Sequence, residues 1–328
     1  MAVVVATRDR PELLARCLHT LLPAAAAAEA EVVVVDSGPS NSAAAELVAQ
    51  SFPSVRYVLQ PQPGLSRARN MGLRAVSAEV VAFTDDDVIV DPGWLVSLRK
   101  VFAEQVRAVC VTGLILAAEL DTPAQLWLER FAGYAKGFSQ QRYDLLAHRR
   151  DDSLYPFDLG RFGSGANIAV RRSDFIALGG FDEALGRGTP ARGGEDLDAF
   201  RRVLEAGGLL IYEPGAVVWH HHCRTEASLR AGAVADGIGL GATLTKWALE
   251  NPIALLSLLR RAPKVLLREW DIKPARSAAE VLANPAVLEL LRTLGLALGP
   301  GWYLQSRRLT ARTARHTTGP VPTHSDRA

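Results

Sequence analysis

The chain has 328 residues, of which 48% are hydrophobic and 22% are charged, and its formal net charge is +2. This composition excludes a chain that is disordered throughout, and the near balance of acids and bases excludes nucleic acid as a partner attracted by a global positive field. One large α/β domain with an appended smaller region fits the length, because single cores stop growing at roughly 250–300 residues.

The cysteines and the N-terminus bear on the cellular compartment. The chain has an odd number of cysteines, and their spacing does not match a metal site: Cys17, Cys110 and Cys223. We therefore expect buried thiols and no disulfide framework. The chain enters an apolar run at Val3 without a signal-like segment, and no run reaches the ~18–20 apolar residues that span a bilayer. We therefore expect a cytoplasmic protein, with a peripheral contact at the inner face of the membrane left open.

Apolar runs and amphipathic segments alternate from the N-terminus. They predict strands at residues 3–6, 32–35, 55–59 and 80–84, and helices from Pro11 and over residues 43–50 and 67–76. This order is typical of a parallel sheet flanked by helices. Thr7, Asp36 and Asp85 follow three of these strands, and parallel sheets bring such positions together in one crevice.

The middle of the chain continues the α/β pattern. It predicts helices at residues 94–103, 175–178 and 195–206, strands at 109–116, 209–212 and 217–219, a mobile or helical aromatic stretch at 127–138, and a loop entering a strand at 160–170. Residues 186–194 are dense in glycine and predict a flexible loop.

Beyond residue 226 the sequence becomes rich in Leu and Ala. It predicts helices, among them residues 253–259 and 265–267, which prolines interrupt. We expect residues 1–226 to form the α/β domain, residues 227–309 a helical C-terminal region, and residues 310–328 a disordered polar tail. The basic residues of the helical region face either solvent or anionic lipid.

Asp85-Asp86-Asp87 follows a predicted apolar strand. Clustered carboxylates repel one another unless a cation neutralises them, and Mg²⁺ or Mn²⁺ commonly bridges one or two carboxylates to a diphosphate. The alternative is an exposed acidic turn, and the triplet alone does not separate the two.

Two other clusters fit the same chemistry. His220-His221-His222 ends a strand in which alternation places His220 and His222 on one face, where an imidazole can complete a metal shell; triple histidines also occur as surface accidents. Glu195-Asp196 begins a helix directly after the glycine-rich loop. One of these acids could serve as a general base, or both could simply be acids that the helix dipole favours at its N-terminus.

The first loop excludes several nucleotide-using classes. The sequence from Ala6 to Pro11 lacks both G-x-G-x-x-G and a P-loop, which disfavours nicotinamide or flavin dehydrogenases, motors and kinases. Asp36 either caps the following helix or binds a base or ribose edge.

Several motifs, in this order, resemble the family-2 glycosyltransferases of GT-A fold, which implies a mostly parallel sheet flanked by helices, over about residues 1–224. They are Ala6-Thr7-Arg8, Val35-Asp36-Ser37-Gly38, Gly64-Leu65-Ser66-Arg67-Ala68-Arg69-Asn70, Thr84-Asp85-Asp86-Asp87, Gly163-Ser164-Gly165-Ala166-Asn167, Gly179-Gly180-Phe181-Asp182, Gly194-Glu195-Asp196 and Trp219-His220.

The resemblance implies a metal-dependent, inverting transfer of one sugar from a UDP-, GDP- or dTDP-linked donor to a glycan, lipid or natural-product acceptor. It implies a nucleotide-sugar site formed by Thr7, Arg8, Asp36, Arg69, Asn70, Asp85 and Asp86. It implies Mn²⁺ or Mg²⁺ held by Asp87, Asp85, His220 and His222, with Asp87 nearest the metal. It implies Asp196 as the catalytic base beside Glu195, and an acceptor-side loop containing Gly163, Ser164, Gly165 and Asn167.

Two departures favour a non-processive enzyme over a processive synthase. No Q-x-x-R-W sequence follows Glu195-Asp196, and no transmembrane helices flank the domain. A sugar-phosphate nucleotidyltransferase is the alternative enzyme, although its glycine- and arginine-rich phosphate loop is absent; a non-catalytic carbohydrate-binding or scaffold protein is the alternative outside enzymes. We expect the C-terminal helices to form a lid that shapes the acceptor site.

Overall fold

The computed structural model describes residues 1–131, 134–151, 155–156, 159–252 and 285–317. Within these ranges the strands are β1 (Ala2–Thr7), β2 (Glu31–Ser37), β3 (Arg56–Gln60), β4 (Val80–Asp85), β5 (Val88–Val90), β6 (Ala108–Ala117), β7 (Gln141–Tyr143), β8 (Asn167–Arg171) and β9 (Leu209–His220). The helices are α1 (Pro11–Ala27), α2 (Ala43–Ser51), α3 (Leu65–Ala75), α4 (Trp94–Glu104), α5 (Pro123–Phe131), α6 (Arg172–Ala177), α7 (Glu195–Glu205), α8 (Glu226–Glu250) and α11 (Pro285–Thr317), with a 3₁₀ turn η1 (Leu159–Phe162).

The strands form one sheet in the order β3-β2-β1-β4-β8-β6-β9-β5, and β7 pairs with β9. The pairs β3-β2, β2-β1, β1-β4 and β6-β9 are parallel, whereas β8 runs antiparallel to both β4 and β6. The predicted α/β sheet flanked by helices is therefore confirmed, with an antiparallel strand at its centre that the sequence did not indicate.

Strand β9 corrects one boundary. Two short strands were predicted at residues 209–212 and 217–219, but the chain forms one strand. The register against β6 shifts between Gly113 and Leu114, so β9 passes residues 214–216 as an irregularity and then resumes pairing.

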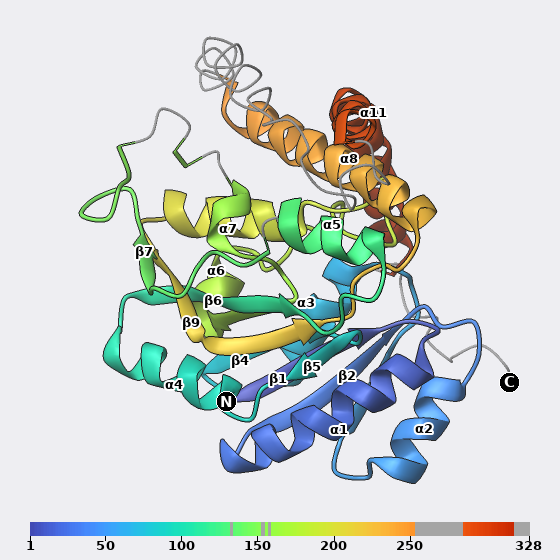
Figure 1. Cartoon of the computed structure of the whole chain (residues 1–328), viewed down its shortest axis with the longest axis vertical. Coiled ribbons are helices and arrows are strands. Elements are labelled where there is room, and N and C mark those ends of the chain that lie inside the picture. The colour runs from blue at the N-terminus through green and yellow to red at the C-terminus, as the bar shows by residue number, and fades with distance from the viewer. Residues whose placement is uncertain (132–133, 152–154, 157–158, 253–284, 318–328) are drawn as a thin grey trace, which may run out of the picture.

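Helices cover both faces of the sheet (Figure 1). Side chains of β1 alternate between two cores: Val3 and Val5 join the core under α1, α2 and α4, and Val4 joins the core under α3 and α7. Gly72 lets α3 lie directly on the sheet, because a Cβ there would overlap the Val4 side chain. Both faces of the sheet are thus covered by helices, and only the ends of the strands are left to form a ligand site.

Helices α8 and α11 pack against each other above the α7 side of the domain (Figure 1). Gly237 and Gly241 of α8 face Gly295 and Gly299 of α11 so closely that a Cβ on any of the four would overlap the other helix. No helix among the described residues combines the length and apolarity needed to cross a bilayer.

The end of α11 corrects the predicted tail. Residues 310–317 are helical and not disordered, because their Ala and Arg residues favour helix and continue a helix that is already packed. Residues 318–328 and the helices expected at 253–259 and 265–267 lie outside the described residues. All three cysteines are free; Cys17 and Cys110 are buried and Cys223 is half-buried.

Candidate functional site

Three strand ends converge at one edge of the sheet. In the register of the parallel strands, Thr7 lies beside Asp36 and Ala6 lies beside Asp85. The prediction that Thr7, Asp36 and the acidic cluster meet at the carboxyl ends of the strands is therefore confirmed.

Asp36 presents an unused acceptor at this edge. Its side chain is fully buried, and Oδ2 accepts a hydrogen bond of 2.9 Å from the Tyr57 hydroxyl. Oδ1 has no hydrogen-bond partner. Burial raises the pKa of this carboxyl. Because Oδ1 is buried without a partner, a ligand that donates a hydrogen bond to it would be stabilised there. Arg8, by contrast, is exposed and pairs with Asp9 at 3.6 Å.

The middle carboxylate of the acidic cluster turns inward. The Thr7 hydroxyl donates to Asp86 Oδ2 at 2.7 Å, and Arg10 Nη1 lies 3.3 Å from Asp86 Oδ1 and 3.2 Å from Asp87 Oδ2. Burial raises the pKa of Asp86 to about 6. Asp86 therefore stabilises the turn through its hydrogen bond to Thr7. Arg10, which the sequence did not indicate, partly neutralises the charges of Asp86 and Asp87.

A buried guanidinium links the first carboxylate to α7. Arg69 Nη2 lies 2.9 Å from Asp85 Oδ1 and also donates to the Gly165 carbonyl at 2.9 Å, and Nη1 donates to Glu195 Oε1 at 3.0 Å. Gly165 is needed here, because a Cβ would lie 2.6 Å from Arg69 Nη1. Both terminal nitrogens of Arg69 are thus used by protein groups and do not point into a ligand site.

Glu195 and Asp196 have different surroundings. Glu195 is buried, and burial together with the charge of Asp196 raises its pKa to about 7 against the opposing effect of Arg69. Asp196 is half-buried; its Oδ2 accepts from the Gly165 N–H at 2.9 Å and its Oδ1 from the Leu197 N–H at 2.8 Å. Of the two acids, Asp196 is the one with an oriented carboxylate that solvent reaches.

His220 is the histidine that meets the acidic cluster. Its Nε2 lies 3.4 Å from Asp87 Oδ1, while Asp87 Oδ1 is buried without a hydrogen-bond partner. Burial lowers the pKa of His220, although the charge of Asp87 opposes this, and a lowered pKa favours the neutral form of the imidazole, which is the form that binds metals.

The other two histidines take different places. His222 Nδ1 lies 3.1 Å from His220 Nδ1 and its Nε2 lies 3.1 Å from Glu129 Oε2, and Tyr134 stacks on both rings. His221 points to the other side, with Nδ1 2.7 Å from Glu119 Oε2. The predicted alternation is confirmed, but His222 lies behind His220 and orients it.

The donor set fits a divalent cation only together with a substrate. Among the described residues no group of three or more His, Cys, Asp or Glu side chains is arranged to hold a metal by itself. Asp87 Oδ1 and His220 Nε2 supply one oxygen and one nitrogen at the same spot. Mn²⁺ and Mg²⁺ commonly complete so small a protein set with diphosphate oxygens and water.

Two asparagines assigned to the site hold the scaffold instead. Asn70 donates to the Phe181 carbonyl and accepts from the Phe181 N–H, both at 2.8 Å. Asn167 is fully buried, accepts from Trp94 Nε1 at 2.8 Å and donates to the carbonyls of Leu114 and Ala216. Both amides are thus used inside the protein.

The remaining residues assigned to the loop differ in their surroundings. Gly163 has a positive φ of 123° and leaves no room for a Cβ beside Thr112, while Ser164 is half-buried. Only Gly165 contacts the site directly, through Arg69 and Asp196.

Arg187 and Asp236 were not singled out from the sequence. Both are exposed, and Arg187 belongs to the glycine-rich loop. Although much of the side chain is exposed, desolvation of the guanidinium acts to lower the pKa of Arg187, and the nearby acidic groups Tyr134, Asp236, Asp85 and Glu195 outweigh it. The flanking glycines were the available signal for Arg187; Asp236 lies on α8, outside every motif.

This chain is similar in sequence to known proteins. The family model "Glycosyl transferase family 2" matches residues 2–179. The pre-mycofactocin glycosyltransferase of Mycobacterium tuberculosis is 29% identical over 192 residues, which are 58% of this chain and 37% of that protein. The validoxylamine A glucosyltransferase of Streptomyces hygroscopicus is 29% identical over 232 residues, 64% of this chain and 52% of that protein. The chain thus spans about half of these relatives or less.

A solved structure shows the same fold. The mannosyltransferase PcManGT from Pyrobaculum calidifontis, in complex with GDP-Man and Mn²⁺, aligns with 98% of this chain and 76% of its own at a TM-score of 0.53 and 18% identity. Because the family model covers more than half of the sequence, this chain belongs to glycosyl transferase family 2.

Proposed function

We propose that this chain transfers one sugar from a nucleoside-diphosphate sugar to an acceptor hydroxyl, with Mn²⁺ or Mg²⁺ and with inversion at the anomeric carbon. The observation that carries the proposal is the pair Asp87 and His220. Asp87 Oδ1 makes no hydrogen bond and lies 3.4 Å from His220 Nε2, at the same sheet edge as Asp36. Family membership and the Mn²⁺ in the solved relative support it.

In this proposal the nucleoside lies at the ends of β1 and β2. Asp36 Oδ1 lacks a donor and accepts one from the base or the ribose. Arg187 is an exposed cation close to Asp85 and lies near the donor diphosphate. The solved structure is in complex with GDP-Man, so guanosine diphosphate sugars are the first to test, followed by UDP- and dTDP-linked sugars.

Asp87 and His220 would hold the cation together with the diphosphate oxygens. The bound ion supplies neutralisation of the charge that builds on the leaving diphosphate. Arg10 keeps the Asp86–Asp87 turn in place through contacts to both carboxylates. His222 fixes the ring of His220 from behind, so that Nε2 points toward Asp87.

Asp196 accepts the proton of the acceptor hydroxyl. Two backbone N–H groups orient its carboxylate, and each oxygen keeps lone pairs for the acceptor. The acceptor oxygen then bonds to the anomeric carbon from the face opposite the diphosphate, which leaves with the electron pair of the broken bond. One displacement of this kind inverts the anomeric centre.

The test is donor hydrolysis and transfer measured with a panel of nucleotide sugars, with Mn²⁺ and in excess chelator. We expect turnover of at least one donor that stops on chelation and returns with Mn²⁺ or Mg²⁺. Turnover that is unchanged in excess chelator would contradict the metal role. No turnover of any donor, together with no donor-induced rise in melting temperature, would favour a scaffold protein.

A further inference from the structure

Helix α11 has an exposed apolar face opposite its packed face. Gly295 and Gly299 face α8, whereas Leu290, Leu294 and Leu298 are 51–58% exposed. The three leucines stand four residues apart and therefore share one side of the helix. Single exposed leucines are common on protein surfaces, but three on the same side of one helix form a contiguous apolar patch.

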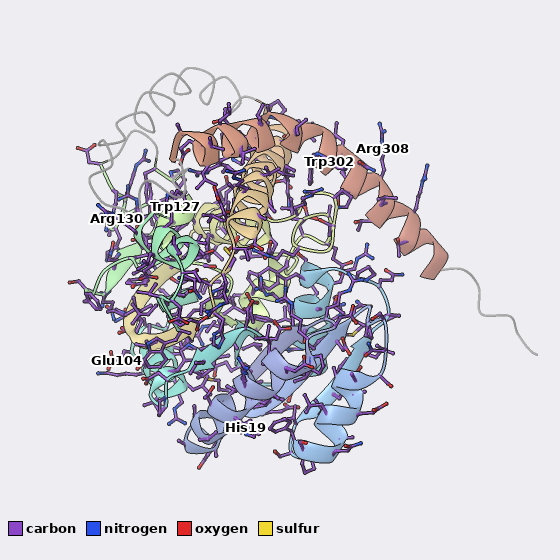
Figure 2. The ribbon with its side chains drawn as sticks, turned by 45° about the vertical axis from the view of Figure 1, so that its right-hand side comes forward. His19, Glu104, Trp127, Arg130, Trp302 and Arg308 are labelled. Atoms are coloured by element: carbon purple, nitrogen blue, oxygen red, sulfur yellow. The ribbon has the colours of Figure 1, made fainter. Side chains whose placement is uncertain are left out.

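The inner face of α11 is already engaged, so the helix is fixed in place. Ser306 donates to the Ala184 carbonyl at 2.6 Å, and Thr310 donates to the Glu183 carbonyl at 3.4 Å. The Arg192 guanidinium lies over the Trp302 ring at 5.8 Å, and Figure 2 shows Trp302 on the long curved α11. The leucine face cannot turn inward without breaking these contacts.

The outer face becomes basic where the leucines end. Leu304, Arg308, Leu309 and Arg312 are all exposed there, and Figure 2 labels Arg308 on the same helix. No Asp or Glu occurs between Glu289 and the end of α11. One side of the helix thus combines apolar area with uncompensated positive charge.

We propose that this outer face of α11 docks onto the surface of a bilayer that contains anionic phospholipid. The leucines enter the boundary between headgroups and acyl chains, and the arginines pair with lipid phosphates. A bilayer surface satisfies both features at once, whereas a second copy of this face would cover the leucines but offer no acidic partner to the arginines. The proposal does not rest on the proposed function, because docking needs neither donor nor metal.

The test is co-sedimentation of the full chain with vesicles. We expect binding to phosphatidylcholine vesicles that contain phosphatidylglycerol, much weaker binding to phosphatidylcholine alone, and loss of binding as salt rises. Replacing Leu290, Leu294 and Leu298 with serine, or Arg308 and Arg312 with alanine, should weaken binding on the order of tenfold or more.

Matched controls separate docking from general stickiness and from unfolding. Two double variants remove exposed residues elsewhere on the surface and should leave vesicle binding unchanged. They are Leu59→Ser with Val106→Ser, and Arg16→Ala with Arg74→Ala. Urea midpoints of all variants should match the wild type.

Three outcomes would overturn the proposal. They are no binding to anionic vesicles, equal binding to neutral ones, and unchanged binding by both α11 variants. Sedimentation velocity supplies the remaining test: a dimer that the serine variant converts to monomer would make the face an interface between copies.

Discussion

Arg69 joins two carboxylates that lie 110 residues apart in the chain, Asp85 at 2.9 Å and Glu195 at 3.0 Å. The guanidinium is almost fully buried, so a single cation ties the end of β4 to the start of α7. In the proposed mechanism these two elements carry the metal-side carboxylates and the base. In that mechanism Arg69 therefore holds the acidic cluster and the base at a fixed distance from each other.

Replacing Arg69 with alanine should destabilise the fold. Asp85 and Glu195 would lose their shared cation, and breaking a buried pair by removing one partner costs about 3–5 kcal/mol. Urea unfolding measures the loss, and Arg74→Ala, an exposed arginine on the same helix, is the control. Adding Glu195→Gln should restore part of the stability; a loss below about 1 kcal/mol in the single variant would contradict the assignment.

Stability should fall as pH rises from about 4.5 to about 7. The pKa of Glu195 is raised from 4.5 to about 7, so the folded state binds the proton more tightly than the unfolded state does. Its contribution is full below the unfolded pKa and is lost as pH rises through the folded pKa. With about 1.4 kcal/mol per pKa unit, the loss is on the order of 3 kcal/mol.

Glu195→Gln is the variant that tests this pH dependence. It should flatten the pH slope of the unfolding free energy, while the share from Asp86, whose pKa is about 6, should remain. An unchanged slope in Glu195→Gln would show that the buried carboxyl does not titrate in this range.

The metal pair can be tested against an adjacent histidine. Asp87→Ala and His220→Ala should each weaken Mn²⁺ binding in the presence of a nucleoside diphosphate, measured by calorimetry, and lower transfer on the order of 100-fold or more. His221→Ala should do neither, because His221 pairs with Glu119 away from the cluster. Equal effects of His220→Ala and His221→Ala would remove His220 from the proposed metal site.

The base assignment depends on a difference between neighbours. Asp196→Asn keeps an oxygen for the Gly165 N–H but loses proton affinity, so transfer should fall on the order of 100-fold or more while donor binding survives. Glu195→Gln should lose less, because Glu195 faces Arg69 and not solvent. If Glu195→Gln is the inactive variant and Asp196→Asn retains activity, the two roles are reversed.

The sequence predicted the strand-end convergence because parallel strands place their carboxyl ends together by geometry. Thr7, Asp36 and Asp85 are neighbours for that reason alone. The facing of His220 and His222 followed in the same way from strand alternation. Such regularities depend on backbone periodicity, which a sequence displays directly.

Other features depend on tertiary contacts that carry no local signal. The antiparallel course of β8 follows from its pairing with β4 and β6, and the inward use of Asn70 and Asn167 follows from loops distant in the chain. Arg10 likewise meets Asp86 and Asp87 only in the folded chain. The helical end of α11 was missed because its composition is polar although its helix propensity is high.

The C-terminal helices should prove part of the working domain, and Lys246 offers the sharpest test. Lys246 Nζ on α8 lies 2.8 Å from both Asp198 Oδ2 and Asp182 Oδ2. Asp198 is fully buried on α7; burial acts to raise its pKa, but Arg202, Lys246 and Arg201 outweigh it and hold the pKa at about 2.

Lys246→Met keeps the apolar stem and removes the charge. Two cations remain on Asp198, so we expect a loss of about 1–3 kcal/mol in urea unfolding, as for a lost hydrogen bond to a charged group. Transfer should also fall several-fold, because Thr243 on the same helix donates to the Gly194 carbonyl at 3.0 Å, directly before Glu195 and Asp196. Lys100→Met, at an exposed lysine on α4, is the control and should change neither quantity. A Lys246→Met variant with wild-type stability and wild-type transfer would mean that α8 rests on the domain without supporting its active site.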